Sequence, residues 1–311
     1  MKVSVLLITY NQEEYIAQTI ETILMQETNF DYEIVIGEDC STDKTRNILR
    51  DYQKNYPDKI RLIFAERNRG LVANFTTTYK ACSGQYIAMI DGDDYWTSPR
   101  KLQMQADFLD SNKEFAICFH PVAMDYEDDA TANRIWPENI GTSFTLEDIL
   151  SANIIPSCTV MFRNGLVREF PDWYYSLKIE DWSLYVLLSQ HGKIGCLNET
   201  MAVHRVHSKG VWSSQEGVEK VKEDIKFYSC MKTHFGRQYR SLINTRLEEY
   251  YYKLAEIYED DKDYGSAKQY IIKSLAMNPF IFNKNSPKKM KVAIRLYLPS
   301  LYKRIKAHYI Q

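Results

Sequence analysis

The sequence predicts an α/β fold, with a mostly parallel sheet covered by helices, followed by an α-helical C-terminal region. Strand and helix signals alternate through the first hundred residues, a rhythm typical of a parallel sheet with helices on both faces. Polar or acidic clusters directly follow three of the predicted strands. From about residue 215 the pattern is helical. We therefore expect two parts, residues 1–215 and residues 216–311.

Short apolar, β-branched runs mark four strands near the N-terminus. They cover residues 3–8, 32–36, 60–64 and 86–90, and each run is typical of a buried strand. Three helices are predicted between them. The first follows Asn11, which we interpret as its N-cap; the second begins at residues 41–43 and ends near Tyr56; the third covers residues 71–81.

After residue 100 the sequence pattern is less regular. Residues 115–119 and 159–162 are further apolar runs, and residues 181–190 form a helix candidate. Two later helices each show one apolar face and resemble a single tetratricopeptide-type unit. The positions on these faces are Leu247, Tyr251, Leu254 and Tyr258, then Ala267, Tyr270, Ile271, Ser274 and Leu275.

Composition narrows the class of protein. A net charge of -2 over 311 residues gives no indication of nucleic-acid binding. The six cysteines are scattered without CxxC spacing, so neither a zinc site nor a disulfide framework is expected, and a reducing compartment is favoured. The first apolar run is too short for a secretory signal, and no stretch reaches the roughly 18 apolar residues of a membrane span. We therefore expect a cytoplasmic location.

The C-terminal region is basic. After Asp263 the chain has ten Lys or Arg residues and no Asp or Glu. In residues 288–292 and 301–306 cations are mixed with apolar side chains. This pattern predicts peripheral contact with an anionic membrane, such as the inner face of the plasma membrane. The alternative is a solvated helix end that packs on the body of the protein.

Residues 91–94 form the most informative cluster. Asp91, Asp93 and Asp94 place three carboxylates within four residues, directly after an apolar strand. Such a cluster repels itself, and a divalent cation such as Mg²⁺ or Mn²⁺, which prefers oxygen ligands, removes the repulsion. Gly92 allows the backbone to turn closely around a ligand. The alternative is an acidic turn after a strand.

Two other strand ends carry polar residues. Thr9, Tyr10 and Asn11 follow the first predicted strand, and Asp39 follows the second. Ligands of open α/β sheets bind outside the carboxyl ends of the strands, so we expect these residues and the acidic cluster to meet in one crevice. Asp39 could accept a hydrogen bond from a base N–H, while the neighbouring Ser41 and Thr42 are better explained as helix caps.

In order and spacing, these motifs resemble the family 2 glycosyltransferases over about residues 1–215. The segments that carry the resemblance are residues 8–11, 38–43, 68–70 and 81–94. The resemblance implies a GT-A fold and a nucleotide-sugar donor, most often UDP-linked, bound through a metal at a DxD motif. It implies that Thr9, Tyr10, Asn11 and Asp39 contact the nucleoside. Glu38 stands where many relatives have Asp.

The resemblance also implies roles for the acids and bases. Asp93 would be the main metal ligand, Asp91 would lie near the ribose and metal, and Asp94 would assist the metal or the following turn. Asp181, with Glu180, matches the acidic pair that supplies the general base of this family; a capped helix start, with acids favoured by the helix dipole, is the alternative. Phosphate or metal contacts are implied for His207, with Arg205 and Lys209 behind it, and Arg67 and Arg69 are further phosphate candidates.

The expected function is inverting, hexosyltransferase-like transfer. The cofactor would be Mn²⁺ or Mg²⁺, and the acceptor would be a hydroxyl of a glycan or lipid-linked acceptor in bacterial surface polysaccharide assembly. Two other functions stay open: a metal-dependent nucleotidyltransferase, disfavoured by the absence of a Gly-rich basic loop after the first strand, and a non-catalytic scaffold that acts through the helical C-terminus. The sequence does not specify the donor sugar, the acceptor or the oligomeric state.

Overall fold

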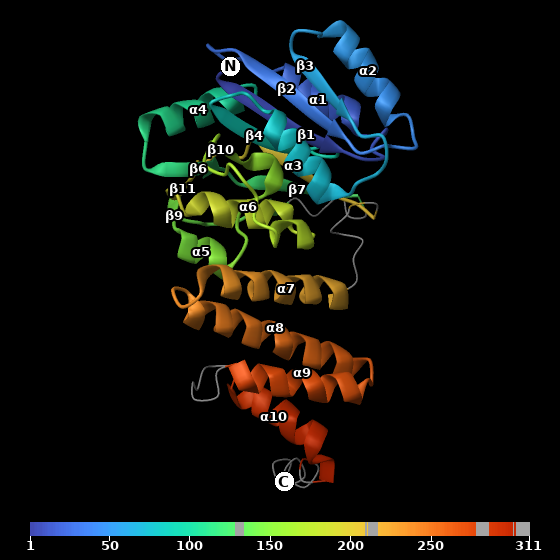
Figure 1. Ribbon diagram of the computed structural model, residues 1–311, viewed down its shortest axis with the longest axis vertical. Helices are drawn as coiled ribbons and strands as arrows, with labels where there is room; N and C mark the ends of the chain where they lie inside the picture. The colour runs from blue at the N-terminus through green and yellow to red at the C-terminus, as the bar shows by residue number, and fades with distance from the viewer. Residues whose placement is uncertain (128–133, 209, 211–216, 278–285, 301, 303–311) are drawn as a thin grey trace. The chain divides into compact units, whose positions relative to one another are not determined.

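The computed structural model describes residues 1–127, 134–208, 210, 217–277, 286–300 and 302 (Figure 1). The chain forms two compact units, Met1–Ser214 and Gln215–Gln311. The first unit contains the sheets and the second contains helices only, in its described part (Figure 1). None of the helices in the described ranges combines the length and apolar character needed to cross a bilayer.

An eight-stranded sheet with the order β3-β2-β1-β4-β10-β6-β11-β9 is the centre of the first unit. The strands are β1 (Val3–Thr9), β2 (Tyr32–Glu38), β3 (Ile60–Phe64), β4 (Tyr86–Asp91), β6 (Phe115–Phe119), β9 (Ser143–Phe144), β10 (Met161–Arg163) and β11 (Lys193–Cys196). The first four are mutually parallel, whereas β10 is antiparallel to both β4 and β6. The predicted α/β class and the four N-terminal strands are therefore confirmed.

Helices cover both faces of this sheet. On one face, α1 (Ile16–Leu24), α2 (Thr45–Asn55) and α4 (Lys101–Ser111) share a core with alternate strand residues such as Val3, Val5 and Leu7. The strand residues between these point to the other face. There α3 (Leu71–Ala81) and α6 (Glu180–Ser189) lie against β2 and β6 and contact each other. The short helix α5 (Leu146–Ser151) packs on α6.

A four-stranded sheet with the order β5-β12-β7-β8 lies beside the large one in the first unit. It contains β5 (Tyr95–Trp96), β7 (Val122–Tyr126), β8 (Arg134–Trp136) and β12 (Ala202–Val206). The 3-10 helices η1 (Ser157–Thr159) and η2 (Tyr174–Ser176) connect other elements. Because β5 starts one residue after the acidic cluster and pairs with β12, it brings residues near 204 to that cluster.

The helical unit consists of α7 (Gly217–Phe235), α8 (Arg240–Asp260), α9 (Tyr264–Met277) and α10 (Ser286–Tyr297). Each helix packs against the next one in the chain. The predicted apolar faces are used: Leu247 and Leu254 of α8, and Ala267 and Ile271 of α9, are buried. Two ion pairs, Lys289 with Glu248 and Arg295 with Glu259, tie α10 to α8.

Two predicted helix starts are wrong. Helix α1 begins at Ile16, and the Asn11 side chain accepts hydrogen bonds from Thr42 instead of capping that helix. Helix α2 begins at Thr45, and Ser41 accepts a hydrogen bond from the Asn11 backbone N–H. These side chains join two loops, because the loops come from adjacent parallel strands and lie within reach of each other.

Candidate functional site

The carboxyl ends of β1, β2 and β4 meet at one edge of the sheet. Thr9 lies opposite Glu38, and Ile8 lies opposite Asp91. The backbone N–H of Asp39 donates to the carbonyl of Thr9 (3.2 Å), and that of Gly92 donates to the carbonyl of Ile8 (3.0 Å). The chain crosses from β3 to β4 on the other side of β1, so the ends of β1 and β4 flank the point where strand order reverses, which is where such sheets bind ligands.

Asp39 is buried and organises the loop after β3. One carboxylate oxygen accepts the backbone N–H of Arg69 at 2.8 Å, and the other accepts that of Gly70 at 2.8 Å. Asn68 donates to the carbonyl of Asp39 at 3.2 Å. Gly70 has a φ of 83°, a left-handed backbone conformation that glycine adopts without strain. Arg69 itself is exposed, and its guanidinium donates to Thr77 at 3.2 Å.

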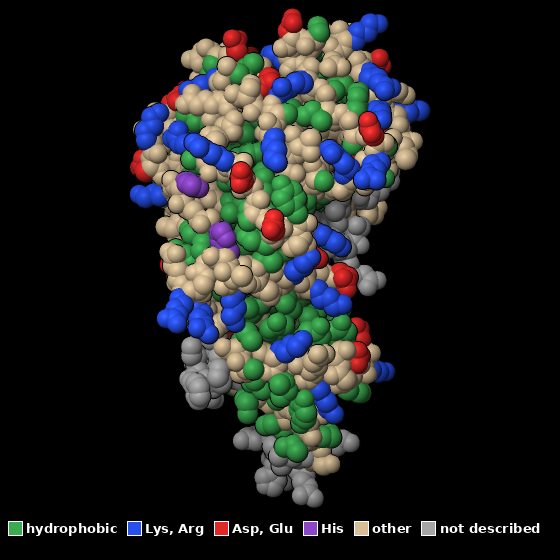
Figure 2. Space-filling model, in the orientation of Figure 1, with side chains coloured by type: hydrophobic (Ala, Val, Ile, Leu, Met, Phe, Trp, Pro, Cys, Tyr) green, Lys and Arg blue, Asp and Glu red, His purple; other side chains and the backbone are tan. Residues whose placement is uncertain are grey.

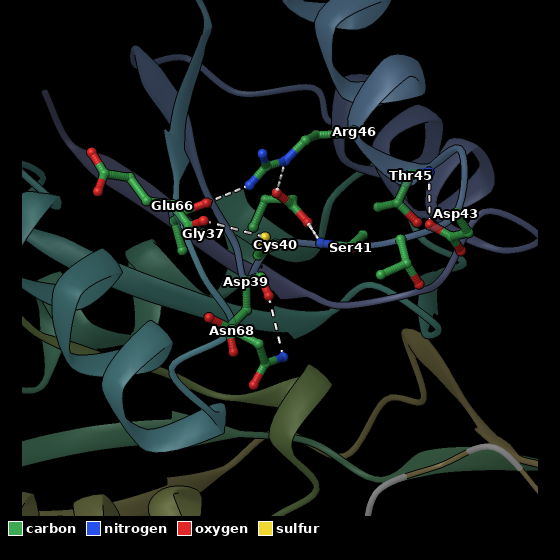
Figure 3. A network of polar contacts seen from close by, with 12 residues as sticks. Gly37, Asp39, Cys40, Ser41, Asp43, Thr45, Arg46, Glu66 and Asn68 are labelled. Atoms are coloured by element: carbon green, nitrogen blue, oxygen red, sulfur yellow. Dashed lines mark hydrogen bonds and ion pairs between the residues drawn. The ribbon is translucent and has the colours of Figure 1, made fainter.

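Glu38 is fully buried and pairs with Arg46 of α2, and one of its oxygens also accepts the backbone N–H of Ser41 (Figure 3). Arg46 extends further and donates to the carbonyl of Ala65 at 2.5 Å. This guanidinium therefore connects the end of β2 to the segment after β3. We call the residues linked in this way the β2 loop network: Asn11, Glu38, Asp39, Ser41, Thr42, Arg46 and residues 68–70.

Beside the network, Thr9 is buried and its hydroxyl contacts Gln12 at 2.7 Å, whereas Tyr10 is 43% exposed. The ring of Tyr10 is therefore accessible to a ligand. Gly92 packs directly on this segment, because a Cβ atom there would come within 2.3 Å of Gln12 Oε1 and 2.8 Å of Thr9 Oγ1. Only glycine allows the acidic turn to lie this close to the end of β1.

Five acids form an acid cluster around the end of β4: Asp91, Asp93, Asp94, Glu180 and Asp181. Asp91 accepts a hydrogen bond from Ser157 at 2.7 Å. Burial, and then the charges of Asp94 and Asp93, raise the pKa of Asp91 to about 7. The negative charge at this carboxylate is therefore only partly compensated by the described residues.

Asp94 is fully buried, and its carboxylate already has hydrogen-bond partners. His204 Nδ1 lies 3.0 Å from both carboxylate oxygens, and the Arg205 backbone N–H donates to one of them at 3.0 Å. The charge of Asp94 raises the pKa of His204 to about 9. Ligand atoms of Asp94, Cys158 and His204 lie within 4.8 Å of one another. Because a thiol is a poor ligand for Mg²⁺ or Mn²⁺ and Asp94 is occupied, this trio is a weak candidate for those ions.

Asp93 contacts His207 directly, with 3.0 Å between a carboxylate oxygen and Nε2. This hydrogen bond raises the pKa of His207, whose ring lies 5.0 Å from the ring of Tyr15. The guanidinium of Arg205 donates to Gln18 and to the carbonyl of Asp93 and lies over the ring of Tyr95. Arg205 thus holds the acidic turn. Lys209 lies outside the described residues.

Glu180 and Asp181 occupy the first turn of α6. Asp181 accepts the backbone N–H of Trp182 at 2.6 Å and a hydrogen bond from Asn153 at 3.4 Å. Burial raises the pKa of Asp181. Burial, and then the charges of Asp181 and Asp91, raise the pKa of Glu180 well above its usual range. The acidic pair and Asp91 are therefore within electrostatic reach of one another, although they lie far apart in the sequence.

Residues 4–170 match the model of the family described as Glycosyl transferase family 2. The chain belongs to this family. An uncharacterized protein of Mycobacterium tuberculosis is 38% identical over 211 residues, which are 68% of this chain and 60% of that protein. The chain thus spans about 60% of the length of this relative. The UDP-Glc:alpha-D-GlcNAc-diphosphoundecaprenol beta-1,3-glucosyltransferase WfaP of Escherichia coli is 28% identical over 237 residues, covering 74% of this chain and 86% of WfaP.

Solved glycosyltransferase structures share the fold. Staphylococcus aureus TarS 1-349 in complex with UDP-GlcNAc superposes with a TM-score of 0.68 at 18% identity, covering 99% of this chain and 92% of that one. Mannosyltransferase PcManGT from Pyrobaculum calidifontis, in complex with GDP-Man and Mn²⁺, has a TM-score of 0.59 at 15% identity, covering 99% and 85%. The predicted GT-A fold of this family 2 chain is thus confirmed.

Three residues of this candidate site were not found by sequence reasoning. Arg46 pairs with Glu38, Ser157 donates to Asp91, and His204 holds Asp94. His204 lies in a segment that the sequence did single out, but His207 was preferred there. The other two are isolated polar residues without a motif, and only the folded sheet brings them to the site.

Proposed function

We propose that this chain is an inverting glycosyltransferase that transfers a sugar from a nucleotide-sugar donor, UDP-linked in our assignment, to a hydroxyl group. The observation that carries the proposal is the juxtaposition of two unlike groups of residues at one sheet edge. The β2 loop network is held by internal hydrogen bonds, while the acid cluster contains carboxylates with raised pKa values. A donor has matching parts: a polar base, an anionic diphosphate and a reacting sugar.

The β2 loop network suits the nucleoside. Each Asp39 oxygen accepts one backbone N–H and retains a lone pair for a base N–H, such as N3 of uracil. The exposed ring of Tyr10 is available to stack on the base, with Thr9 and Asn11 lining the same edge. Because the loops are already fixed, donor binding would not have to order them.

The acid cluster suits a divalent cation, Mn²⁺ or Mg²⁺. Asp91 and Asp93 would hold it, with His207 beside Asp93, because burial and then repulsion by neighbouring carboxylates raise the pKa of Asp91 to about 7. We assign Asp94 to positioning, since His204 and Arg205 occupy its oxygens. A bound cation would stabilise the negative charge of the leaving diphosphate. Arg69 is proposed as a further phosphate contact, since its side chain is exposed at the network.

Asp181 is proposed as the general base. Its carboxylate would accept the proton of the acceptor hydroxyl as the new bond to C1 of the sugar forms and the bond from C1 to the diphosphate breaks, with the electron pair leaving on the diphosphate. A raised pKa makes Asp181 a stronger base than an ordinary carboxylate. Glu180, whose pKa is raised further out of its usual range, would stay protonated beside it.

For the acceptor we propose a glycan or a lipid-linked saccharide of bacterial surface polysaccharide assembly, used at the cytoplasmic side of the membrane. Support comes from the printed specificity of WfaP, which acts on a diphosphoundecaprenol-linked sugar. The half-buried Asn153 and the segment that follows α5 adjoin Asp181 and would line the acceptor side.

The test is product analysis after incubation with UDP- and GDP-sugars, Mn²⁺ and lipid-linked or soluble saccharides. The proposal predicts release of free UDP or GDP and a glycoside of inverted anomeric configuration. In a parallel incubation with UTP or GTP and a sugar 1-phosphate, release of pyrophosphate with formation of a nucleotide-sugar would instead establish a nucleotidyltransferase. Absence of nucleotide binding under all these conditions would favour a scaffold protein.

A further inference from the structure

Helix α10 has two different apolar faces. Val292 and Leu296 are buried in the core of the helical unit. On the opposite side, Met290, Ile294 and Leu298 follow one another at a spacing of four residues, which places them in one row. Met290 is 46% exposed and Leu298 is 53% exposed, so this second row is accessible in the described structure. The backbone N–H of Leu298 donates to Ile294 at 2.8 Å, so the row is continuous.

Lys291 is exposed and borders this row, one turn before Ile294. Lys288, also exposed, lies one turn earlier on α10, in line with Val292. Tyr297, 48% exposed, lies one residue from Leu298, and its hydroxyl donates to the carbonyl of Lys268 at 3.2 Å. We call these residues the α10 surface: Lys268, Lys288, Met290, Lys291, Ile294, Tyr297 and Leu298. Figure 2 shows hydrophobic side chains gathered with Lys and Arg side chains over this part of the helical unit.

The sequence around the α10 surface carries Lys and Arg but no acidic side chains. From residue 264 to residue 311 the chain contains ten Lys or Arg residues and no Asp or Glu. Two of these cations are neutralised within the unit, since Lys289 pairs with Glu248 and Arg295 pairs with Glu259. Lys288 and Lys291 have no carboxylate partner among the described residues, so their charge is available to an outside partner.

We propose that the α10 surface binds an anionic lipid membrane, with Met290, Ile294 and Leu298 entering the boundary between headgroups and acyl chains. A helix lies in that boundary when an apolar row is flanked by Lys or Arg. Tyr297 has the amphipathic character of interfacial aromatic residues, and Lys268 can keep its ammonium group in the headgroup layer while its stem covers apolar surface.

An anionic membrane fits better than a second copy of the chain. Two copies that met through this surface would bring their own lysines together, and like charges disfavour such a contact. An anionic bilayer supplies the opposite charge over the whole surface. Each exposed Lys close to it raises the affinity about fivefold.

The inference is independent of the transfer reaction and is tested without it. Full-length protein is sedimented with vesicles of phosphatidylcholine alone and of phosphatidylcholine mixed equally with phosphatidylglycerol. We expect binding to the mixed vesicles that weakens as NaCl is added. Lys288→Glu with Lys291→Glu should lower the affinity at least about 25-fold, and Met290→Glu with Leu298→Glu should abolish binding.

The matched control is Lys54→Glu with Lys80→Glu, two exposed lysines of the first unit, which should leave vesicle binding unchanged. Thermal melts of each variant check folding, and the salt dependence of the wild-type protein provides a reading that needs no variant. The inference is overturned if the protein ignores both vesicles, binds both equally, or binds the mixed vesicles as well after the α10 substitutions. It is also overturned if the only effect of those substitutions is to convert a dimer into monomers.

Discussion

The β2 loop network and three acids of the acid cluster, Asp91, Glu180 and Asp181, satisfy their carboxylates in different ways. In the β2 loop network, Glu38 has Arg46 and the Ser41 N–H, and Asp39 has two backbone N–H groups. In the acid cluster, Asp91 has one hydroxyl as its hydrogen-bond partner, and burial and then like charges raise its pKa to about 7. Glu180 and Asp181 also have raised pKa values.

The two groups of carboxylates therefore differ in what they do: one group fixes the backbone, and the other favours protonation or a cation. Buried carboxylates that are fully hydrogen-bonded fix the backbone around them, so the network is a preformed surface. Carboxylates crowded together in a buried site favour protonation or a cation, and such groups are typical of functional sites. Apart from the controls, each substitution below changes either the β2 loop network or the acid cluster with its contacts.

The largest expected effect is on transfer, and it comes from the acid cluster. Asp181→Asn should lower the rate of sugar transfer about a thousandfold, since an amide cannot accept the acceptor proton. Nucleotide binding should not change. Glu180→Gln is the control on the neighbouring position. Because Glu180 is expected to be protonated already, its amide analogue should cost less than about tenfold. Transfer that persists in Asp181→Asn would refute the assignment of the base.

The network should respond through stability. Arg46→Ala leaves Glu38 buried without its cation, which should lower the free energy of unfolding by about 3 kcal/mol in urea titrations. Arg50→Ala is a matched control on the same helix. Arg50 lies over the same Phe64 ring, at 5.2 Å against 4.9 Å for Arg46, but it is exposed. It should cost about 0.5–1 kcal/mol. Equal costs for the two variants would mean that the ion pair does not stabilise the network.

A smaller effect is expected at the contact between Asp94 and His204. The pKa of His204 is raised to about 9, so its contribution to stability is complete below the ordinary pKa and is lost as pH rises through about 9. His204 is partly exposed, and we therefore expect a loss of only about 1 kcal/mol between pH 6 and pH 9 or above. His204→Gln should remove this loss. Urea unfolding in the presence of EDTA measures the pH dependence of stability in the wild-type protein and in His204→Gln. The same pH dependence in these two proteins would contradict a stabilising contact between His204 and Asp94.

The sequence predicts the fold wherever local pattern determines it. The runs at 60–64 and 115–119 coincide with strands β3 and β6, because each is a short apolar segment between helices or turns. Helix α3 has the predicted bounds 71–81. The start of α2 is misjudged, because Ser41 and Thr42 have the composition of caps but bond to Asn11 on another loop.

The site is predictable only in part, for a similar reason. Asp91, Asp93, Asp39 and Asp181 belong to motifs, so the sequence identifies them. The residues that hydrogen-bond to the acids belong to no such motif. Ser157 is 66 residues from Asp91, and His204 is 110 residues from Asp94. Their proximity depends on η1 lying against β4 and on the pairing of β5 with β12, which no local pattern encodes.

The most direct test of the account is calorimetric titration of UDP and GDP, with and without Mn²⁺, into the wild-type protein and into Asp93→Asn and Asp39→Asn. The account predicts nucleotide binding that Mn²⁺ strengthens about tenfold or more in the wild-type protein. Asp93→Asn should retain weak binding and lose the response to Mn²⁺, whereas Asp39→Asn should weaken binding with or without the metal. Nucleotide binding that is absent, or that responds to Mn²⁺ equally in all three proteins, would contradict the roles assigned to the β2 loop network and the acid cluster.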